Sequence, residues 1–287
     1  MKPSSFTYHK PQSVNEALAI LAEVAPDDGR VLAGGQSLVP TMAFRVARPR
    51  HLVDINNIDA LRRLEVRDGK LCIGACVRHA AFHRPVVDNP LGALLARIVR
   101  HIAHPPIRSR GTLCGSLANA DPASEWCTAA ACLDAEIVAQ STGGTRVIPV
   151  RDYFQGIMTT ALREDELLTE VRLPLLDAQA RFGFYEFNRR AGDFAIAMAV
   201  AVYQLRDGKI AEPRIAVGGA EAHPRRLEAA EQALVGQTPG EASFATAGER
   251  AAQAITDPLE DPNTSAQYRR DLVHVVMQRA LSASLTT

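Results

Sequence analysis

The sequence has no surplus of charge of either sign. Lysine and arginine together number 32, and so do aspartate and glutamate, which gives a formal net charge of zero. A protein that binds nucleic acid usually carries a clustered basic surplus on the face that meets the phosphates. The balanced charge therefore predicts no nucleic-acid partner.

Long hydrophobic runs are also lacking. The longest apolar stretch covers residues 194–203, well short of the ~20 residues that a membrane-spanning helix needs. Residues 1–12 mix lysine, histidine, proline and serine and contain no apolar segment of the kind that a secretory signal requires. We therefore expect a cytoplasmic protein without a transmembrane segment.

Cysteine is scarce, and the chain contains only Cys72, Cys76, Cys114, Cys127 and Cys132. An odd number in a chain without a secretory signal argues against a disulfide framework. The spacings lack the companion ligands that a zinc or iron–sulfur site requires. We expect ordinary buried thiols and no metal site.

The first helix has a clear start signal. Ser13 and Glu16 have the spacing of a capping box, in which each side chain accepts a hydrogen bond from a free backbone N–H at the helix start. One apolar stripe with helical spacing follows, formed by Val14, Ala17, Leu18, Leu21 and Ala22. Pro26 is expected to end the element.

Two Asp-Gly pairs predict tight hairpins. Asp68-Gly69 separates the apolar segments 64–66 and 71–73, and Asp207-Gly208 separates 200–205 from the segment that begins at Ile210. Asp-Gly supplies the positive φ angles of a type I′ turn. Further strands are expected at 30–33, 51–55, 168–173 and 214–217, and helices at 91–101, 123–135, 227–234 and 268–283. Because strands and helices interleave without a strict βαβ rhythm, we predict an α+β fold, with a boundary near 174–181.

Two glycine-containing loops have the composition of phosphate-binding segments. The first follows a predicted strand and consists of Ala33, Gly34, Gly35, Gln36, Ser37 and Leu38. The second begins at Gly111 and continues with Thr112, Leu113, Cys114, Gly115 and Ser116. Glycine lets the backbone come within hydrogen-bond distance of a ligand, and successive N–H groups can converge on an anion. Each loop alone is equally compatible with a plain tight turn.

Neither loop matches the common nucleotide-binding motifs. A Rossmann fingerprint needs a third glycine where Leu38 stands. The G-x-x-x-x-G-K-[ST] motif of P-loop proteins is absent as well. These absences argue against a nicotinamide dehydrogenase and against a nucleoside triphosphatase.

Taken with their flanks, the two loops resemble the FAD loops of the medium subunit of the xanthine dehydrogenase and carbon monoxide dehydrogenase family. Three further stretches agree and occur in the expected order: 52–55 (LVDI), 166–174 (ELLTEVRLP) and 189–195 (RRAGDFA). The resemblance covers essentially the whole chain.

The resemblance implies a fold with two domains. Residues 1–176 would form a two-lobed FAD-binding domain of the vanillyl-alcohol oxidase (PCMH) type, with lobes at about 1–57 and 58–176. Residues 177–287 would form a smaller C-terminal α+β domain of the CO dehydrogenase flavoprotein type.

The resemblance also implies which residues contact the cofactor. Residues 33–38 and 112–116 would surround the FAD pyrophosphate and the adjoining ribityl chain, and Ile102, Glu125 and Leu168 would lie near the cofactor. Two positions depart from the family pattern. Cys114 replaces a usual glycine, so its side chain must point away from the phosphates or its φ must be permissive. Glu186, together with Tyr185, stands near a position where some relatives have a lysine close to the flavin.

The function implied by the resemblance is electron transfer. This chain would carry FAD, a small subunit would carry two [2Fe–2S] clusters, and a large molybdopterin subunit would carry the molybdenum cofactor. The implied assembly is a dimer of heterotrimers. No residue of this chain would be catalytic. A stand-alone flavin oxidase of the vanillyl-alcohol oxidase type and an adapter subunit without cofactor remain alternatives.

Other polar residues have simpler interpretations than catalysis. His101 and His104 could hold a metal from a helix end, but no carboxylate or cysteine at ligand spacing accompanies them. Asp121 and Glu125 could form an acid–base pair, although contact with the cofactor and stabilisation of a helix N-terminus are favoured.

Overall fold

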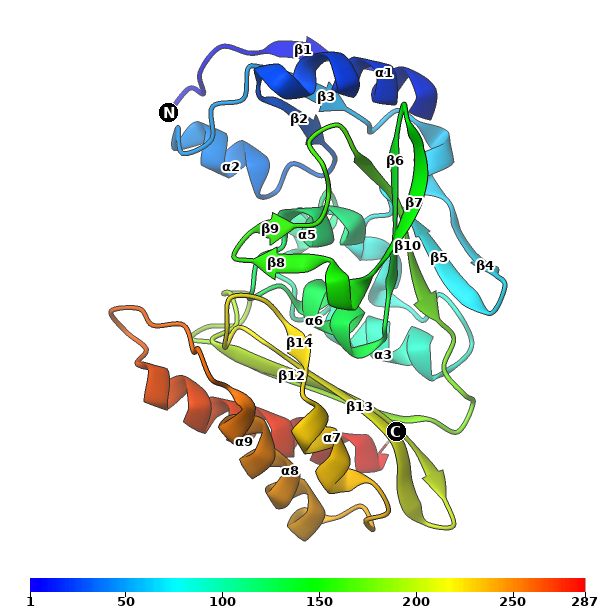
Figure 1. The fold of residues 1–287 in the computed structure, drawn as a ribbon, viewed down its shortest axis with the longest axis vertical. Coiled ribbons are helices and arrows are strands. Elements are labelled where there is room, and N and C mark those ends of the chain that lie inside the picture. The colour runs from blue at the N-terminus through cyan, green and yellow to red at the C-terminus, as the bar shows by residue number, and fades with distance from the viewer. Residues whose placement is uncertain (287) are drawn as a thin grey trace.

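Three sheets succeed one another along the long axis of the molecule (Figure 1). The computed structural model describes residues 1–286. The first sheet is parallel, has the order β1-β3-β2, and lies beside two helices. Its elements are β1 (Thr7–His9), α1 (Val14–Val24), β2 (Gly29–Leu32), α2 (Leu38–Ala43) and β3 (His51–Asp54).

The second sheet is antiparallel, with the strand order β4-β5-β10-β6-β7. Its strands are β4 (Leu64–Arg67), β5 (Lys70–Gly74), β6 (Glu136–Ser141), β7 (Gly144–Pro149) and β10 (Leu167–Pro174). The chain between β5 and β6 forms α3 (Pro90–Ile98), α4 (Pro105–Arg108), α5 (Leu113–Asn119) and α6 (Glu125–Cys132). A small hairpin of β8 (Phe154–Gly156) and β9 (Thr159–Thr160) precedes β10.

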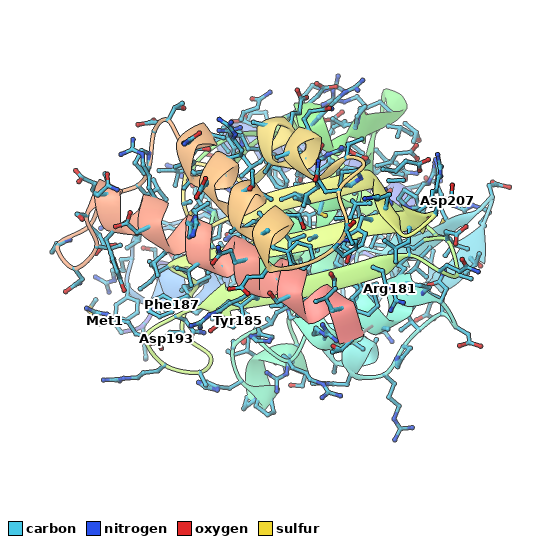
Figure 2. All side chains as sticks on the ribbon, turned by 90° about the horizontal axis from the view of Figure 1, so that it is seen from below. Met1, Arg181, Tyr185, Phe187, Asp193 and Asp207 are labelled. Atoms are coloured by element: carbon cyan, nitrogen blue, oxygen red, sulfur yellow. The ribbon has the colours of Figure 1, made fainter. Side chains whose placement is uncertain are left out.

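The third sheet is antiparallel as well, with the order β11-β12-β13-β14. It consists of β11 (Arg181–Phe187), β12 (Ala197–Arg206), β13 (Lys209–Gly218) and β14 (Arg225–Arg226). Three helices, α7 (Glu228–Leu234), α8 (Glu241–Ala254) and α9 (Ala266–Ala283), cover its outer face (Figure 2).

Strand β12 shows why this sheet is buried on both faces. Met198 and Val200 pack into the core shared with the first two sheets, whereas Ala199 and Ala201 pack into the core beneath α7, α8 and α9. Successive strand residues point to opposite faces, and a strand covered on both sides reads as a continuous apolar run. The apolar stretch 194–203 of the sequence is explained by this position.

Most of the helices and strands predicted from local sequence signals are present in the structure. Both Asp-Gly turns have positive φ at both residues, 52° and 70° at Asp68-Gly69 and 51° and 73° at Asp207-Gly208. Ser13 caps α1 by accepting from the N–H of Glu16 at 3.2 Å. The carboxylate of Glu16 accepts from the N–H of Gln12 at 2.7 Å instead of that of Ser13. The α+β prediction is confirmed.

Several elements were not predicted from the sequence. Helix α8 is rich in alanine and small polar residues, so its apolar stripe is weak, and it forms because it packs against α7 and α9. The β6–β7 hairpin turns through Thr142 and Gly143 without an Asp-Gly or Asn-Gly pair. The strand expected at 214–217 is the end of the longer strand β13.

Within residues 1–286, no helix combines the length and the apolar character needed to cross a bilayer.

Gly183 marks the closest approach between β11 and α9. A Cβ added there would lie 1.7 Å from the carbonyl oxygen of Ala280, so the helix or the strand would have to move. We expect Gly183→Ala to lower the free energy of unfolding by about 3 kcal/mol, measured by urea denaturation. Gly143→Ala is the control, because a Cβ at this exposed turn would meet only the hydroxyl of Ser141 at 3.5 Å. Equal stability of the two variants would contradict this packing.

Candidate functional site

The first glycine loop connects the end of β2 to the start of α2 and touches the second loop. A Cβ on Gly34 would lie 2.4 Å from the carbonyl oxygen of Arg110 and 2.6 Å from the Cα of Gly111. Any side chain at this position would therefore push the two loops apart. Gly35 has a φ of 70°, in the left-handed region that glycine adopts without steric cost.

The second loop is fixed by a helix cap. Thr112 is the N-cap of α5, and its hydroxyl accepts a hydrogen bond from the N–H of Gly115 at 3.0 Å. A Cβ on Gly115 would lie 2.7 Å from this hydroxyl, so the cap and the glycine depend on each other. The thiol of Cys114 points into the core and donates to the carbonyl of Ile73 at 3.4 Å. Of the two ways expected to accommodate Cys114, the structure thus shows the side chain turned inward.

A polar bridge links the two loops from behind, and the sequence did not reveal it. Asn56 donates to the carbonyl of Ala33, at the start of the first loop, at 2.8 Å. Arg78 donates to the side-chain oxygen of Asn56 at 2.5 Å and also to the carbonyl of Arg110, just before the second loop. Asp54 accepts from Asn56 at 2.5 Å and so orients its amide. The two loops are therefore held by one connected set of hydrogen bonds.

His79 supports the second loop as a neutral imidazole. Its backbone N–H donates to the carbonyl of Gly111 at 2.9 Å, and its Nδ1 accepts from the indole of Trp126 at 2.9 Å. Burial, followed by the charges of Arg108 and Arg78, lowers the pKa of His79 to about 4. Because Nδ1 accepts, the single proton of the ring is on Nε2.

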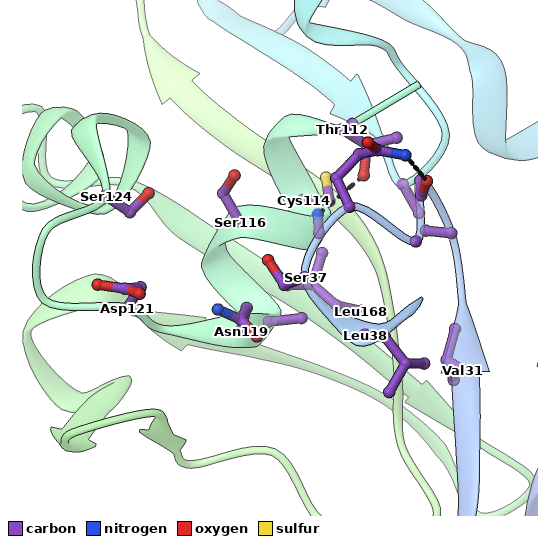
Figure 3. A pocket seen from close by; sticks show the side chains of 18 of the residues that line it. Val31, Ser37, Leu38, Thr112, Cys114, Ser116, Asn119, Asp121, Ser124 and Leu168 are labelled. Carbon is purple, nitrogen blue, oxygen red and sulfur yellow. Dashed lines mark hydrogen bonds between the residues drawn. The ribbon is translucent and has the colours of Figure 1, made fainter. Parts of the chain in front are cut away.

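A cavity of about 720 Å³ opens where the two loops meet (Figure 3). Its volume is in the range of small-molecule and cofactor sites. Every predicted site residue except Leu113 lines it, namely Ala33, Gly34, Gly35, Gln36, Ser37, Leu38, Ile102, Thr112, Cys114, Gly115, Ser116, Glu125 and Leu168. Leu113 is the first residue of α5, and its side chain is buried in the core.

The remaining walls come from segments far apart in the sequence. Gly192, Asp193 and Phe194, between β11 and β12, reach the cavity from the third sheet. Residues 158–160, at the β8–β9 hairpin, close another side. Residues 189–195 belong to the family resemblance. No local pattern in the sequence predicts that part of this stretch forms a wall of the cavity.

The two loops can bind an anionic phosphate group through their backbone, without a charged side chain. The first N–H groups of a helix have no partner within the helix, and both α2 and α5 begin at the cavity. Helix N-termini and glycine loops bind phosphates through such N–H groups. The absence of a Cβ at Gly34 lets the two loops meet, and its absence at Gly115 leaves room for the Thr112 cap. The residues present therefore fit the pyrophosphate of FAD.

Two carboxyl groups are buried in this region: Glu125, the first residue of α6, lines the cavity, whereas Glu186 on β11 is not part of its lining. Burial, with a smaller contribution from Asp121, raises the pKa of Glu125 to about 7. Burial and the neighbouring Glu125 raise the pKa of Glu186 to about 8. Asp121 itself accepts from the N–H of Ala123 at 2.9 Å, which stabilises the turn before α6.

The two histidines His101 and His104 have different surroundings. His104 packs against the loop after β11, where a Cβ on Gly192 would lie 2.4 Å from its ring, and His101 lies near Glu186. Across residues 1–286 there is no group of three or more histidine, cysteine, aspartate or glutamate side chains that could hold a metal. The five cysteines are free and buried.

Comparison with known protein families gives two matches, one after the other along the chain. Residues 4–176 match the FAD binding domain in molybdopterin dehydrogenase, and residues 182–284 match the CO dehydrogenase flavoprotein C-terminal domain.

Individual relatives span the full length. The chain is 38% identical over 286 residues to the 6-hydroxypseudooxynicotine dehydrogenase complex subunit alpha of Paenarthrobacter nicotinovorans, covering 99% of this chain and 96% of the relative. It is 38% identical to the caffeine dehydrogenase subunit beta of Pseudomonas sp. strain CBB1, covering 98% and 95%. A chain of carbon monoxide dehydrogenase from Hydrogenophaga pseudoflava superposes with a TM-score of 0.94 at 34% identity, covering 100% and 99%.

The raised pKa values of Glu125 and Glu186 predict a pH-dependent stability. At a pH below the ordinary carboxyl pKa, Glu125 and Glu186 are protonated in both the folded and the unfolded chain. As the pH rises further, the unfolded chain ionises first, so the folded state loses stability until the pH passes the folded values of about 7 and about 8. We expect the free energy of unfolding of the cofactor-free chain to fall by several kcal/mol between pH 5 and pH 8.5, measured by urea denaturation.

The variant Glu186→Gln should show a smaller fall over the same range. Glu136→Gln is the control, since Glu136 is half-exposed and its carboxylate pairs with Lys70 at 2.6 Å. An unchanged pH dependence in Glu186→Gln would show that this carboxyl group ionises normally.

Proposed function

Because the chain belongs to the family of FAD-binding domains of molybdopterin dehydrogenases, we propose that it carries FAD and transfers electrons within a heteromeric molybdenum hydroxylase. It takes electrons from [2Fe–2S] clusters of a partner subunit and passes them to an external acceptor. Hydroxylation takes place on the large subunit, which holds the molybdenum cofactor. The observation that carries this proposal is the cavity lined by both glycine loops.

The chain's own residues bind and position the cofactor. Residues 33–38 and 112–116 would surround the pyrophosphate, with backbone N–H groups that have no partner within residues 1–286 and the hydroxyls of Ser37 and Ser116 as donors. The N–H of Gly115 stays bonded to the hydroxyl of Thr112. Ile102 and Leu168 offer apolar contacts, and Glu125 a buried carboxyl group. When bound, FAD supplies the ability to accept and release two electrons, while the protein sets its position and surroundings.

In a heteromeric molybdenum hydroxylase the redox groups are carried by different subunits, so this chain needs partner subunits. The names of two relatives, a complex subunit alpha and a subunit beta, describe parts of larger enzymes. The five buried thiols are dispersed, and residues 1–286 offer no cluster site. We propose a small [2Fe–2S] subunit and a large molybdopterin subunit as partners, assembled as a cytoplasmic dimer of heterotrimers. Residues 1–176 would form the FAD-binding domain and 177–287 the C-terminal domain.

Cys114, where the family usually has a glycine, is the one feature of the loops that would favour an adapter without cofactor. Its thiol bonds to the carbonyl of Ile73, away from the space between the loops. This cysteine therefore does not obstruct the cavity, and the adapter hypothesis loses its support.

Purification of the chain by itself tests the assignment. We expect a visible flavin spectrum with about one FAD per chain, identified after acid release. Candidate substrates should leave the flavin oxidised until the two partner subunits are added. Reduction of the flavin by substrate without partners would instead indicate a stand-alone oxidase. A colourless chain that takes up no added FAD would overturn the proposal.

Gly35→Val should abolish FAD retention, because the new side chain would crowd Leu32 and Val39, each 3.1 Å from an added Cβ, and strain a backbone with φ of 70°. The flavin content of the purified variant gives the measurement. Gly69→Val is a matched control: Gly69 also has a φ of 70° but lies in the β4–β5 turn, with nothing within 4 Å of an added Cβ. Full FAD content in Gly35→Val would refute the role of the first loop.

A further inference from the structure

Strand β1 lies at the edge of the first sheet and is held by few contacts. It pairs only with β3, and none of its residues, Thr7–His9, belongs to the buried apolar core. Tyr8, in its middle, is 50% exposed. Segments with few buried contacts open locally at low free-energy cost, so a single side-chain contact has a large influence on how firmly β1 is attached.

One side-chain contact of β1 reaches the polar bridge behind the two glycine loops. The hydroxyl of Tyr8 donates to Oδ2 of Asp54, the last residue of β3. The other oxygen of Asp54, Oδ1, accepts from the backbone N–H of Asn56 at 2.9 Å and from its side-chain amide at 2.5 Å. Tyr8 and Asn56 therefore bind the two oxygens of one carboxylate and together fix its orientation.

Asn56 connects this carboxylate to both loops. Its amide nitrogen donates to the carbonyl of Ala33 at 2.8 Å. Its amide oxygen accepts from Arg78 at 2.5 Å, and Arg78 also donates to the carbonyl of Arg110. None of the side chains in this series lines the cavity, so they act on a bound cofactor only through the loops. Hydrogen bonds in series polarise and align one another, so the loss of the first one loosens those that follow.

We propose that Tyr8 is a positioning residue for FAD, which acts through Asp54 and Asn56 to hold the two glycine loops at the spacing that the pyrophosphate requires. The proposal rests on FAD binding in the cavity, as proposed above. A site that already has its bound arrangement loses less free energy when the ligand orders it. The coupling is reciprocal, so bound FAD in turn strengthens the attachment of β1. The N-terminal strand and the cofactor are thus linked, although no residue of β1 lines the cavity.

Titration of the cofactor-free full chain with FAD tests this role in Tyr8→Phe, which removes only the hydroxyl. We expect the affinity to fall about 5-fold, as for the loss of one hydrogen bond, with an unchanged circular dichroism spectrum. Tyr268→Phe is the matched control, because Tyr268 is also half-exposed, at 43%, but lies on α9. In an Asn56→Ala background, Tyr8→Phe should cause no further loss, because the connection to the loops is already broken.

Amide hydrogen exchange in β1 gives a second, independent test. In the unaltered chain, FAD should slow exchange at the N–H of Thr7, which donates to the carbonyl of Arg50 at 2.8 Å. Tyr8→Phe should lose this protection, whereas a tyrosine that only stabilised the fold would change exchange equally with and without FAD. Unaltered FAD affinity in Tyr8→Phe, additive losses in the double variant, or exchange in β1 that does not respond to FAD would each overturn the positioning role. An unaltered chain that binds no FAD would overturn the proposed function instead.

Discussion

The close approach of two backbone segments, at Gly34 and at Arg110–Gly111, is the constraint on which the rest of the site depends. A single methyl group on Gly34 would lie within 2.4 Å of the opposite carbonyl oxygen. Because the loops meet there, the first turns of α2 and α5 open into the same cavity. Neither loop alone encloses a cofactor-sized space. Their contact turns two ordinary loop-to-helix connections into one site for a diphosphate.

Both hydrogen bonds and apolar packing hold the two loops together. Asn56 donates to the carbonyl of Ala33 at the start of the first loop, and Arg78 donates to the carbonyl of Arg110 just before the second. Asp54 accepts from the amide of Asn56 and so orients it. This network is only partly buried, and each of its hydrogen bonds favours the one arrangement in which the two loops meet. The apolar core beneath it runs from the first sheet to the inner face of β12. The third sheet can therefore contribute residues 192–194 to the cavity wall without a flexible connection.

Short-range signals predicted much of this architecture, because they act within a few residues. The Ser13 cap, the Asp-Gly turns and the two glycine loops are examples, and the α+β class and the family followed from them. The bridge from Asn56 to Arg78 could not be predicted, because it joins segments 22 residues apart through side chains of common types. Glu186 was visible only as a departure from the family pattern. Its burial depends on β11 packing against residues near α3, which no local pattern reveals.

Titration of cofactor-free protein with FAD, comparing the unaltered chain with Gly34→Ala, tests the central claim most directly. Circular dichroism and the urea midpoint would establish that the variant is folded. The account predicts that the added methyl group separates the loops and weakens FAD binding at least 100-fold, which corresponds to about 2.7 kcal/mol. Equal affinities in two folded proteins would contradict the claim that contact between the loops creates the FAD site.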